Sequence, residues 1–322
     1  MIKEPTVFIL GAGASYPYGY PTGQELREQI CSSFVQDVNA YFAQEKRVDP
    51  CIAIAFRNAK TFTETFFNSS TKSIDLFLAR NPEFMLLGKW AIIFRLFAAE
   101  RESQFREHIK DRNQDWYSYL FNRLTDNLVR TTDYERFTEN NLSIITFNYD
   151  RSLEHFLYES ISNSFSSIGR ENMTEQLNKL GFVHIFGHLS GLEWQDIFGK
   201  LEYGRDINFI NVQKVAENLK IIYEEKDNAQ LPIAQDLVRK AKRIFFLGFG
   251  YAKENLEALN ITQVIRDEQE IYGTALGFMP REIRQVQSIF LEAIRSKGTH
   301  GTVRNDIMIE DLDCLSLLRK HL

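Results

Sequence analysis

The sequence has few cysteines, and none of them are paired at a spacing that binds zinc. Cys31, Cys51 and Cys314 are odd in number and far apart, and no Cys-x-x-Cys pair occurs. Neither a structural zinc site nor a disulfide framework is indicated, so we expect three ordinary thiols. Among six histidines, only His184 and His188 lie close together in the sequence. We therefore expect no metal site.

Long apolar runs and an excess of positive charge are also missing. No stretch approaches the roughly 20 apolar residues that span a bilayer. The first residues, Met1 to Pro5, lead directly into a strand pattern instead of a signal peptide. A formal net charge of −5 argues against a general electrostatic grip on nucleic acid. We therefore expect a cytoplasmic protein that binds neither a membrane nor nucleic acid directly.

What the chain does have is a glycine-rich turn near its start. Val7 to Leu10 is a short apolar run typical of a buried parallel strand, and Gly11-Ala-Gly-Ala-Ser15 follows it directly. Glycines without a Cβ let a backbone turn tightly and approach a ligand, so a strand, such a turn and a following helix can form a pyrophosphate site. A tight turn without any ligand is the alternative, because the short Gly-x-Gly pattern is common.

The segment after this turn is predicted to be helical. Thr22 and Glu25 form a capping-box pattern, and apolar residues recur at helical spacing through Thr22 to Asn39. From residue 40 to 127 no strand is evident, and aromatic residues recur with helical periodicity. We therefore predict a helical insertion, residues 40–135, within a single 1–322 domain.

Four further strands are predicted after the insertion, separated by helices. They are Leu142 to Phe147, Phe182 to Phe186, Arg243 to Leu247 and Ile271 to Phe278. Short, continuously apolar strands that alternate with helices indicate an α/β fold, a Rossmann-like parallel sheet flanked by helices. A final helix is predicted around Glu310 to Leu318.

The polar residues of interest directly follow strands. They are Gly11 to Ser15, Asn148 to Asp150, Gly187 with His188, and Gly248 to Tyr251. Ligands of open parallel sheets bind beyond the carboxyl ends of the strands, so these residues are expected to share one site. Asn148 could instead be a simple helix cap after its strand.

Two familiar nucleotide sites do not fit. Hydride-transferring Rossmann enzymes carry Gly-x-Gly-x-x-Gly and an acidic residue about twenty positions on, whereas here Tyr16 stands in the third glycine's place and a helix pattern follows. A P-loop is excluded because no Gly-Lys-Ser/Thr follows the glycines.

With these motifs together, the sequence resembles the sirtuin-like superfamily, in its divergent bacterial branch that degrades NAD in antiviral defence. The matching pieces are Gly11 to Ser15 with Gly19-Tyr-Pro-Thr-Gly23, Thr146-Phe-Asn-Tyr-Asp150, Val183-His-Ile-Phe-Gly187 and Leu247-Gly-Phe-Gly250. Together they cover some 40 residues of the chain, in matching order and spacing.

The resemblance implies a role for each matching residue. The turn, whose residues are Gly11, Ala12, Gly13, Ala14 and Ser15, would hold the NAD phosphates. Tyr20, Pro21 and Thr22 would lie in the loop over the nicotinamide ribose. Asn148 would hold the ribose and orient a water molecule, with Asp150 beside the nicotinamide. Gly248, Phe249 and Gly250 would line the adenosine side.

The histidine of the family motif is displaced here. The family places histidine directly before the strand-end glycine, where this chain has Phe186. His184 faces the same side of the strand, about 6.6 Å further back, and we expect it to be the general base. His188, just past the turn, is the alternative base, and a merely hydrogen-bonded strand histidine is a third interpretation.

Two other departures bear on the substrate. Family deacylases hold zinc with two Cys-x-x-Cys pairs and carry Asp-Phe-Arg after the loop proline, and this chain has Thr22-Gly-Gln24 and no such pairs. Water is thus the expected nucleophile, and the expected activity is hydrolysis of NAD to nicotinamide and ADP-ribose, with no metal required. Alternatives are a non-catalytic NAD- or ADP-ribose-binding regulatory module, and a protein deacylase or ADP-ribosyltransferase.

Uncontrolled loss of NAD would kill the host cell, so an NAD hydrolase should be regulated. We expect control through homo-oligomer formation or through an activating partner, such as an ATPase or a nucleic-acid-sensing protein. The helical insertion is the expected place for these contacts.

Overall fold

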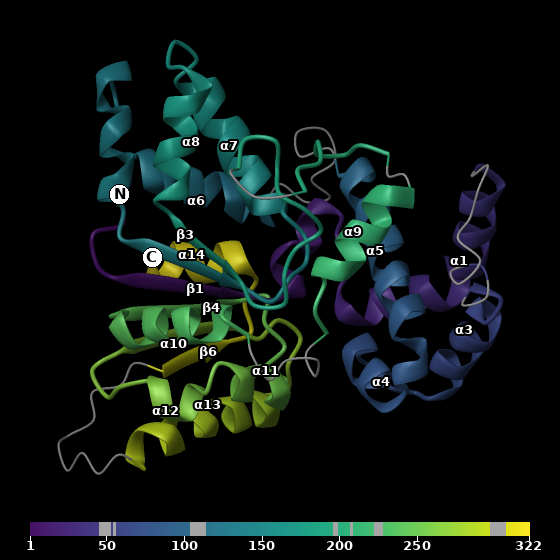
Figure 1. The fold of residues 1–322 in the computed structure, drawn as a ribbon. Coiled ribbons are helices and arrows are strands. Elements are labelled where there is room, and N and C mark those ends of the chain that lie inside the picture. The colour runs from purple at the N-terminus through teal and green to yellow at the C-terminus, as the bar shows by residue number, and fades with distance from the viewer. Residues whose placement is uncertain are drawn as a thin grey trace.

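The computed structural model describes residues 1–44, 53, 56–103, 114–195, 199–206, 209–221, 228–296 and 307–322. These residues form an α/β fold around a six-stranded parallel sheet, which confirms the predicted fold class (Figure 1). The strand order is β3-β2-β1-β4-β5-β6. The strands are β1 (Thr6–Leu10), β2 (Leu142–Thr146), β3 (Gly181–His184), β4 (Arg243–Leu247), β5 (Glu270–Thr274) and β6 (Ile307–Glu310).

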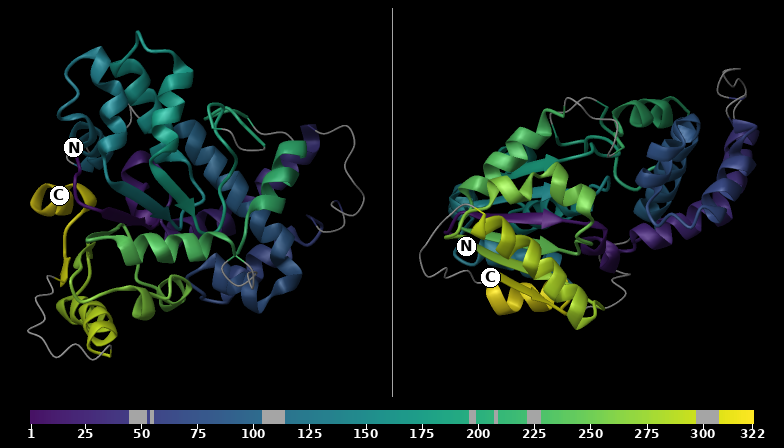
Figure 2. Two further views of the ribbon diagram at one scale, coloured as in Figure 1. Left: turned by 60° about the vertical axis from the view of Figure 1, so that its left-hand side comes forward. Right: turned by 90° about the horizontal axis from the view of Figure 1, so that it is seen from below.

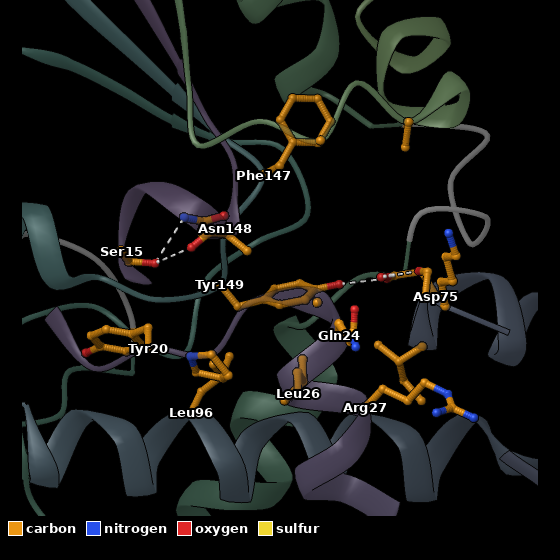
Figure 3. Close-up of a pocket in the computed structure, with 18 of the residues that line it drawn as sticks. Ser15, Tyr20, Gln24, Leu26, Arg27, Asp75, Leu96, Phe147, Asn148 and Tyr149 are labelled. Atoms are coloured by element: carbon orange, nitrogen blue, oxygen red, sulfur yellow. Dashed lines mark hydrogen bonds between the residues drawn. The ribbon is translucent and has the colours of Figure 1, made fainter. Parts of the chain in front are cut away.

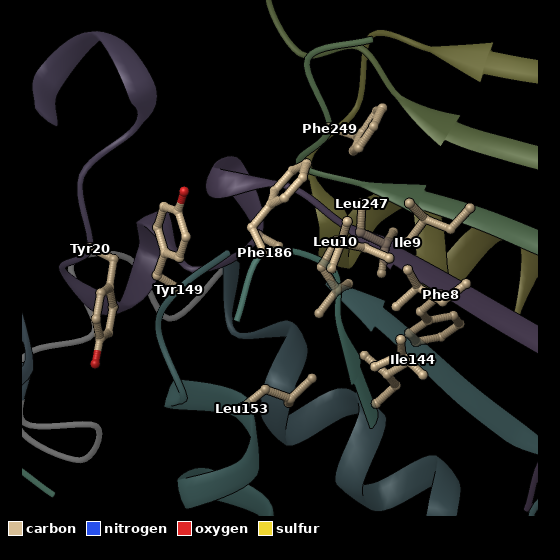
Figure 4. Close-up of a cluster of buried hydrophobic side chains, with 14 of the residues drawn as sticks. Phe8, Ile9, Leu10, Tyr20, Ile144, Tyr149, Leu153, Phe186, Leu247 and Phe249 are labelled. Carbon is tan, nitrogen blue, oxygen red and sulfur yellow. The ribbon is translucent and has the colours of Figure 1, made fainter. Parts of the chain in front are cut away.

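The first strand of the chain is central in the sheet. All five residues of β1 are buried, and the strand pairs with β2 on one side and β4 on the other. Its last residue, Leu10, is in register with Thr146 of β2 and Leu247 of β4. Three strands therefore end at one rim, and an apolar cluster around β1 lies directly behind that rim (Figure 4).

Helices cover both faces of the sheet, as crossovers of parallel strands require. Figure 1 shows α6, α7, α8 and α14 on one face and α10 to α13 on the other. The first group is α6 (Trp116–Thr125), α7 (Ser152–Ser164), α8 (Arg170–Asn178) and α14 (Cys314–His321). The second is α10 (Gln230–Lys240), α11 (Lys253–Ala258), α12 (Ile261–Val264) and α13 (Pro280–Arg295).

The remaining long helices form a lobe beyond the carboxyl ends of the strands, away from the two termini (Figure 2). It contains α1 (Gly23–Gln44), α3 (Ala59–Asn68), α4 (Ile74–Arg80), α5 (Met85–Glu102) and α9 (Phe209–Asn218). Its interior is aromatic: Trp90, Phe34 and Phe62 are almost wholly buried. The lobe takes in α1 and α9, whereas α6 packs with α7 and α14, so its boundaries differ from the predicted insertion 40–135.

The Thr22–Glu25 capping box that was predicted to start α1 is present. The Thr22 backbone amide donates to Glu25 Oε2 at 3.0 Å, and the Glu25 amide donates to Thr22 Oγ1 at 3.3 Å. The helix nevertheless runs to Gln44, past the predicted end at Asn39.

Several sequence predictions were wrong in detail. Glu310, predicted to start the last helix, ends the sixth strand, and α14 begins only at Cys314. The strand was missed because only residues 311–313 separate it from α14, so no loop signal divides the two elements. The strands β3 and β5 stop at His184 and Thr274, earlier than predicted, and the chain then turns.

Some expectations fall outside the described residues, namely those on Cys51, His108 and His300. Cys31 and Cys314 are free thiols, as predicted. In the part of the chain that the structure covers, no helix is both long and apolar enough to cross a bilayer.

Candidate active site

The glycines of the first and fourth strand-end turns fit together backbone to backbone. The Gly11 amide donates to the Leu247 carbonyl oxygen and the Gly13 amide to the Gly248 carbonyl oxygen, each at 3.0 Å. A Cβ on Gly11 would lie 2.6 Å from the Gly248 oxygen, and Gly248 has a positive φ of 56° with the backbone of Ala14 against it. The close packing of the two turns therefore explains why these positions need glycine, which has no Cβ.

A cleft of about 690 Å³ opens between this rim of the sheet and the helical lobe (Figure 3). The sheet side supplies residues from three strand-end turns, and the lobe supplies Leu26, Arg27, Asp75 and Leu96. This is the switch point of the sheet, because the connections that follow β1 and β4 lead to strands on opposite sides of it.

The predicted site residues divide into those that line this cleft and those that do not. Lining the cleft are Ala12, Ser15, Tyr20, Pro21, Asn148, Asp150 and Gly250. Lying behind it or beside it are Gly11, Gly13, Ala14, Thr22, Gly248 and Phe249. The first and second motifs therefore meet, whereas several glycines contribute through the packing of the turns.

Asn148 links the second strand to the glycine turn. Its side-chain Nδ2 donates to the Gly11 carbonyl oxygen at 3.0 Å and to Ser15 Oγ at 3.4 Å. These bonds fix the orientation of the amide, and no hydrogen bond to its Oδ1 occurs among the described residues. Asn148 is no helix cap, because α7 begins at Ser152.

Asp150 is the buried carboxyl of the cleft. Burial raises its pKa above the usual value, and hydrogen bonds from Ser152 and Ser15 partly oppose that rise. Both the backbone amide and the hydroxyl of Ser152 donate to Asp150 Oδ1. The raised pKa makes the Asp150 carboxylate a better proton acceptor than an exposed aspartate, which is a property that proton transfer uses.

Two tyrosines that lie along the cleft are held by their hydroxyl groups. The hydroxyl of Tyr20 lies 2.5 Å from that of Tyr203, which lies 2.9 Å from Ser103 Oγ. The Tyr149 hydroxyl is within 3.1 Å of Asp75 Oδ1, so its ring lies across the cleft towards the lobe (Figure 3). The aromatic walls are therefore fixed in orientation.

Arg151, which the sequence analysis did not single out, joins the site to the lobe. It is 1% exposed, and its guanidinium donates to both carboxylate oxygens of Glu100 on α5, at 2.6 and 3.1 Å. It also donates to Ser190 Oγ and to the Leu201 carbonyl oxygen, each at 2.6 Å. Because the residue directly follows Asp150, this buried pair fixes the loop that carries the carboxyl group.

His184 lies outside the cleft. Its ring lines a separate cavity of about 340 Å³ together with His188, Glu154 and Lys220. Its Nε2 is 2.5 Å from Glu154 Oε1, and its Nδ1 is 3.2 Å from the backbone oxygen of Asn148. Both ring nitrogens are thus engaged, and the described residues that line the cleft include no histidine.

His188 occupies the same second cavity, with its ring centroid 5.1 Å from that of His184. Burial, then the nearby His184, lowers the pKa of His188 to about 4, so its imidazole is neutral at pH 7. Phe186, in the family's histidine position, is buried and packs against Phe147 at 5.6 Å between ring centroids.

No group of three or more histidine, cysteine, aspartate or glutamate side chains within the described ranges could hold a metal ion. A scan of the sequence against protein-family models finds no match, and a search of curated proteins finds no similar sequence.

Proposed function

We propose that the protein is a sirtuin-like NAD glycohydrolase. One observation carries the proposal: the Asn148 amide, oriented by the glycine turn, meets the buried Asp150 in a cleft at the switch point of the sheet. Such clefts bind dinucleotides in open parallel sheets. The cleft volume of about 690 Å³ is also in the range of sites for small-molecule ligands.

The proposed reaction replaces the bond between ribose C1′ and the nicotinamide nitrogen by a bond from C1′ to water. The electron pair of the broken bond neutralises the pyridinium, so the leaving group needs no acid. Asn148 Oδ1 accepts a hydrogen bond from the water or from a ribose hydroxyl. The proton that the water loses passes to the Asp150 carboxylate and then to solvent, and the products are nicotinamide and ADP-ribose.

Asp150 takes this role because no described residue that lines the cleft carries an imidazole. The low pKa of an ordinary aspartate makes its carboxylate a weak base, and burial raises the pKa of Asp150 and so strengthens it as a base. The oxocarbenium-like ribose of the transition state is positive, and a nearby carboxylate stabilises it.

We further propose that the hydrolase serves antiviral defence and is silent until a trigger acts. The lobe forms one wall of the cleft through Leu26, Arg27 and Leu96. An oligomer contact or a partner, such as an ATPase or a nucleic-acid sensor, that moves α1 or α5 would therefore reshape the substrate site. The native mass and the NAD turnover rate, measured with and without candidate partners, test this part.

A second candidate, a non-catalytic module that binds NAD or ADP-ribose, is favoured by one observation. The family's catalytic histidine position is filled by Phe186, which is buried against Phe147. Such a module would need the turn and Asn148 for binding and would release no nicotinamide.

The decisive experiment incubates purified protein with NAD and measures nicotinamide, in parallel with ADP-ribose binding by calorimetry. A hydrolase releases nicotinamide, and Asn148→Ala abolishes the release. Asn163→Ala, on an exposed position of α7, is the matched control and retains full activity. Saturable ADP-ribose binding with no nicotinamide, even with a partner present, would establish the binding module instead.

A further inference from the structure

His184 lies between a carboxylate and a backbone carbonyl. Its Nδ1 is 3.2 Å from the Asn148 oxygen, and its Nε2 is 2.5 Å from Glu154 Oε1. A carbonyl oxygen can only accept, so Nδ1 must carry a proton. An ionised carboxylate also only accepts, so Nε2 carries the second proton and the ring is an imidazolium.

The electrostatics of the pair agree with this assignment. Burial by itself would lower the pKa of His184, but the charge and hydrogen bond of Glu154 outweigh burial and raise it. Burial would likewise raise the pKa of Glu154, and the adjacent His184 lowers it instead. Both side chains are largely buried, with exposures of 10% and 5%, so water screens their attraction little.

We propose that His184 and Glu154 form a positioning pair for Asn148, in which the imidazolium holds the Asn148 backbone oxygen and takes no part as a base. This inference rests on the proposed function of the cleft. Both side chains line the second cavity, and neither is among the described residues that line the cleft.

Asn148 is thereby fixed at three points. Its backbone amide donates to Thr146 Oγ1 at 3.0 Å, its backbone oxygen accepts from His184, and its side-chain amide donates to Gly11 at 3.0 Å. With the bond from its side-chain amide to Ser15 Oγ at 3.4 Å, four hydrogen bonds hold Asn148. Two of the four hold the backbone, so the direction of Oδ1 into the cleft depends on them. A base would instead need a free ring nitrogen that faces the reacting atoms, and His184 has neither.

Other ionisable groups also face this pair. Asp150 contributes a further attraction to His184, His188 lies beside it, and Lys220 lines the same cavity from the segment after α9. Glu154 on α7 supplies the dominant charge, and Arg151 also lines the cavity. Glu154 should therefore control the protonation of His184.

Nuclear magnetic resonance of ring-labelled histidine tests the assignment without any activity. We expect both nitrogens of His184 to be protonated at pH 6.5, where an ordinary histidine is half protonated, and Glu154→Gln to shift the titration of His184 to lower pH. The matched change Glu159→Gln, on the same helix, should leave that titration unchanged. A neutral His184 at pH 6.5 in the unsubstituted protein would overturn the proposal.

Binding and turnover separate positioning from catalysis. His184→Ala should weaken ADP-ribose binding about tenfold and lower kcat as well, which is the effect of losing one charge-assisted hydrogen bond. His184→Gln, whose amide can donate to the same oxygen, should recover part of both losses. A loss in kcat with unchanged ADP-ribose affinity would identify His184 as a base and refute the pair.

The two proposals fail separately. If the protein binds no ADP-ribose and releases no nicotinamide, the proposed function fails, and the protonation of His184 still decides the positioning pair. If nicotinamide is released normally by His184→Ala, the proposed function stands and the positioning pair fails.

Discussion

The two cavities at this rim of the sheet differ in what their polar groups do. In the large cleft, Asn148 has an acceptor atom that no described residue uses, and Asp150 is the one deeply buried carboxyl. In the smaller cavity, His184 and Glu154 are bonded to each other. The two ionisable side chains of the smaller cavity are thus engaged with each other, whereas the cleft presents polar atoms that a ligand could bind.

The largest effect should come from the buried ion pair between Arg151 and Glu100, which joins the strand-end loop to the lobe. Arg151→Met leaves the Glu100 carboxylate buried and unpaired, which should cost about 3 to 5 kcal/mol of folding free energy. Urea unfolding measures it, with Arg239→Met in the exposed pair with Asp236 as the control, expected within about 0.5 kcal/mol. A loss under 1 kcal/mol would show that the pair does not tie the lobe to the sheet.

Replacing the Asp150 carboxyl group should lower NAD turnover without lowering the stability of the fold. Asp150→Asn keeps the size of the side chain and should lower NAD turnover about 100-fold or more, because the proton acceptor is lost. The unfolding midpoint should stay close to that of the original protein, since Ser152 can still donate to the amide oxygen. Turnover within a factor of three of the original would remove Asp150 from the mechanism.

Two buried histidines, His155 and His188, should make the folded protein less stable in acid. Burial, then Arg151, lowers the pKa of His155 to about 4, and burial, then His184, does the same for His188. Because these pKa values lie below that of an unfolded histidine, the stabilisation is complete above about pH 6.5 and is lost as pH falls towards 4. Each histidine can account for a loss of at most about 3 kcal/mol of folding free energy.

Urea unfolding at two pH values can assign part of that loss of stability to His155. His155 stacks on Tyr203 with ring centroids 3.8 Å apart, so His155→Phe keeps the stacking and removes the titration. Urea unfolding at pH 7 and pH 5 should then show a smaller difference than in the original protein. An equal difference would mean that His155 is already exposed to protons in the folded state.

The smallest effect should be at the interlocked turns. Gly13→Ala places a Cβ 2.9 Å from the Gly248 Cα, and backbone must shift to admit it. We expect a loss of about 1 to 3 kcal/mol and weaker ADP-ribose binding. Gly169→Ala, which lies outside the residues that line the cleft and whose Cβ would meet nothing within 4 Å, is the control. Equal stability and equal ADP-ribose affinity of the two variants would show that the packing of the two turns supports neither.

The parallel sheet and the meeting of the first two motifs could be predicted from the sequence. Each strand is a short apolar run that stops at a turn, so Gly11 and Asn148 had to share one rim. The hydrogen-bond partner of His184 could not be predicted. Alternation along a strand predicts on which face of the sheet a side chain lies, but it does not predict which residue that side chain contacts. Glu154, the partner that turns the ring away, lies on a helix whose rotation only the packed structure fixes.

The role of Arg151 was also out of reach. Its neighbours come from α5, from the residues after β3 and from residues 201–202, which no local pattern connects. The one available signal was its position directly after Asp150, in a helix N-terminus otherwise rich in small and polar residues. The sixth strand was missed for a simpler reason, because residues 311–313 alone separate it from α14.

The placement of β1 has a consequence for how the chain is made. Of the six strands, β1 is synthesised before the other five, yet both its neighbours, β2 and β4, are synthesised much later. Until residues 243–247 emerge, one edge of this wholly buried strand has no strand to pair with, and slow, non-local pairing of this kind exposes a nascent chain to aggregation. Chaperones that bind the nascent segment around β1 should therefore raise the yield of folded protein.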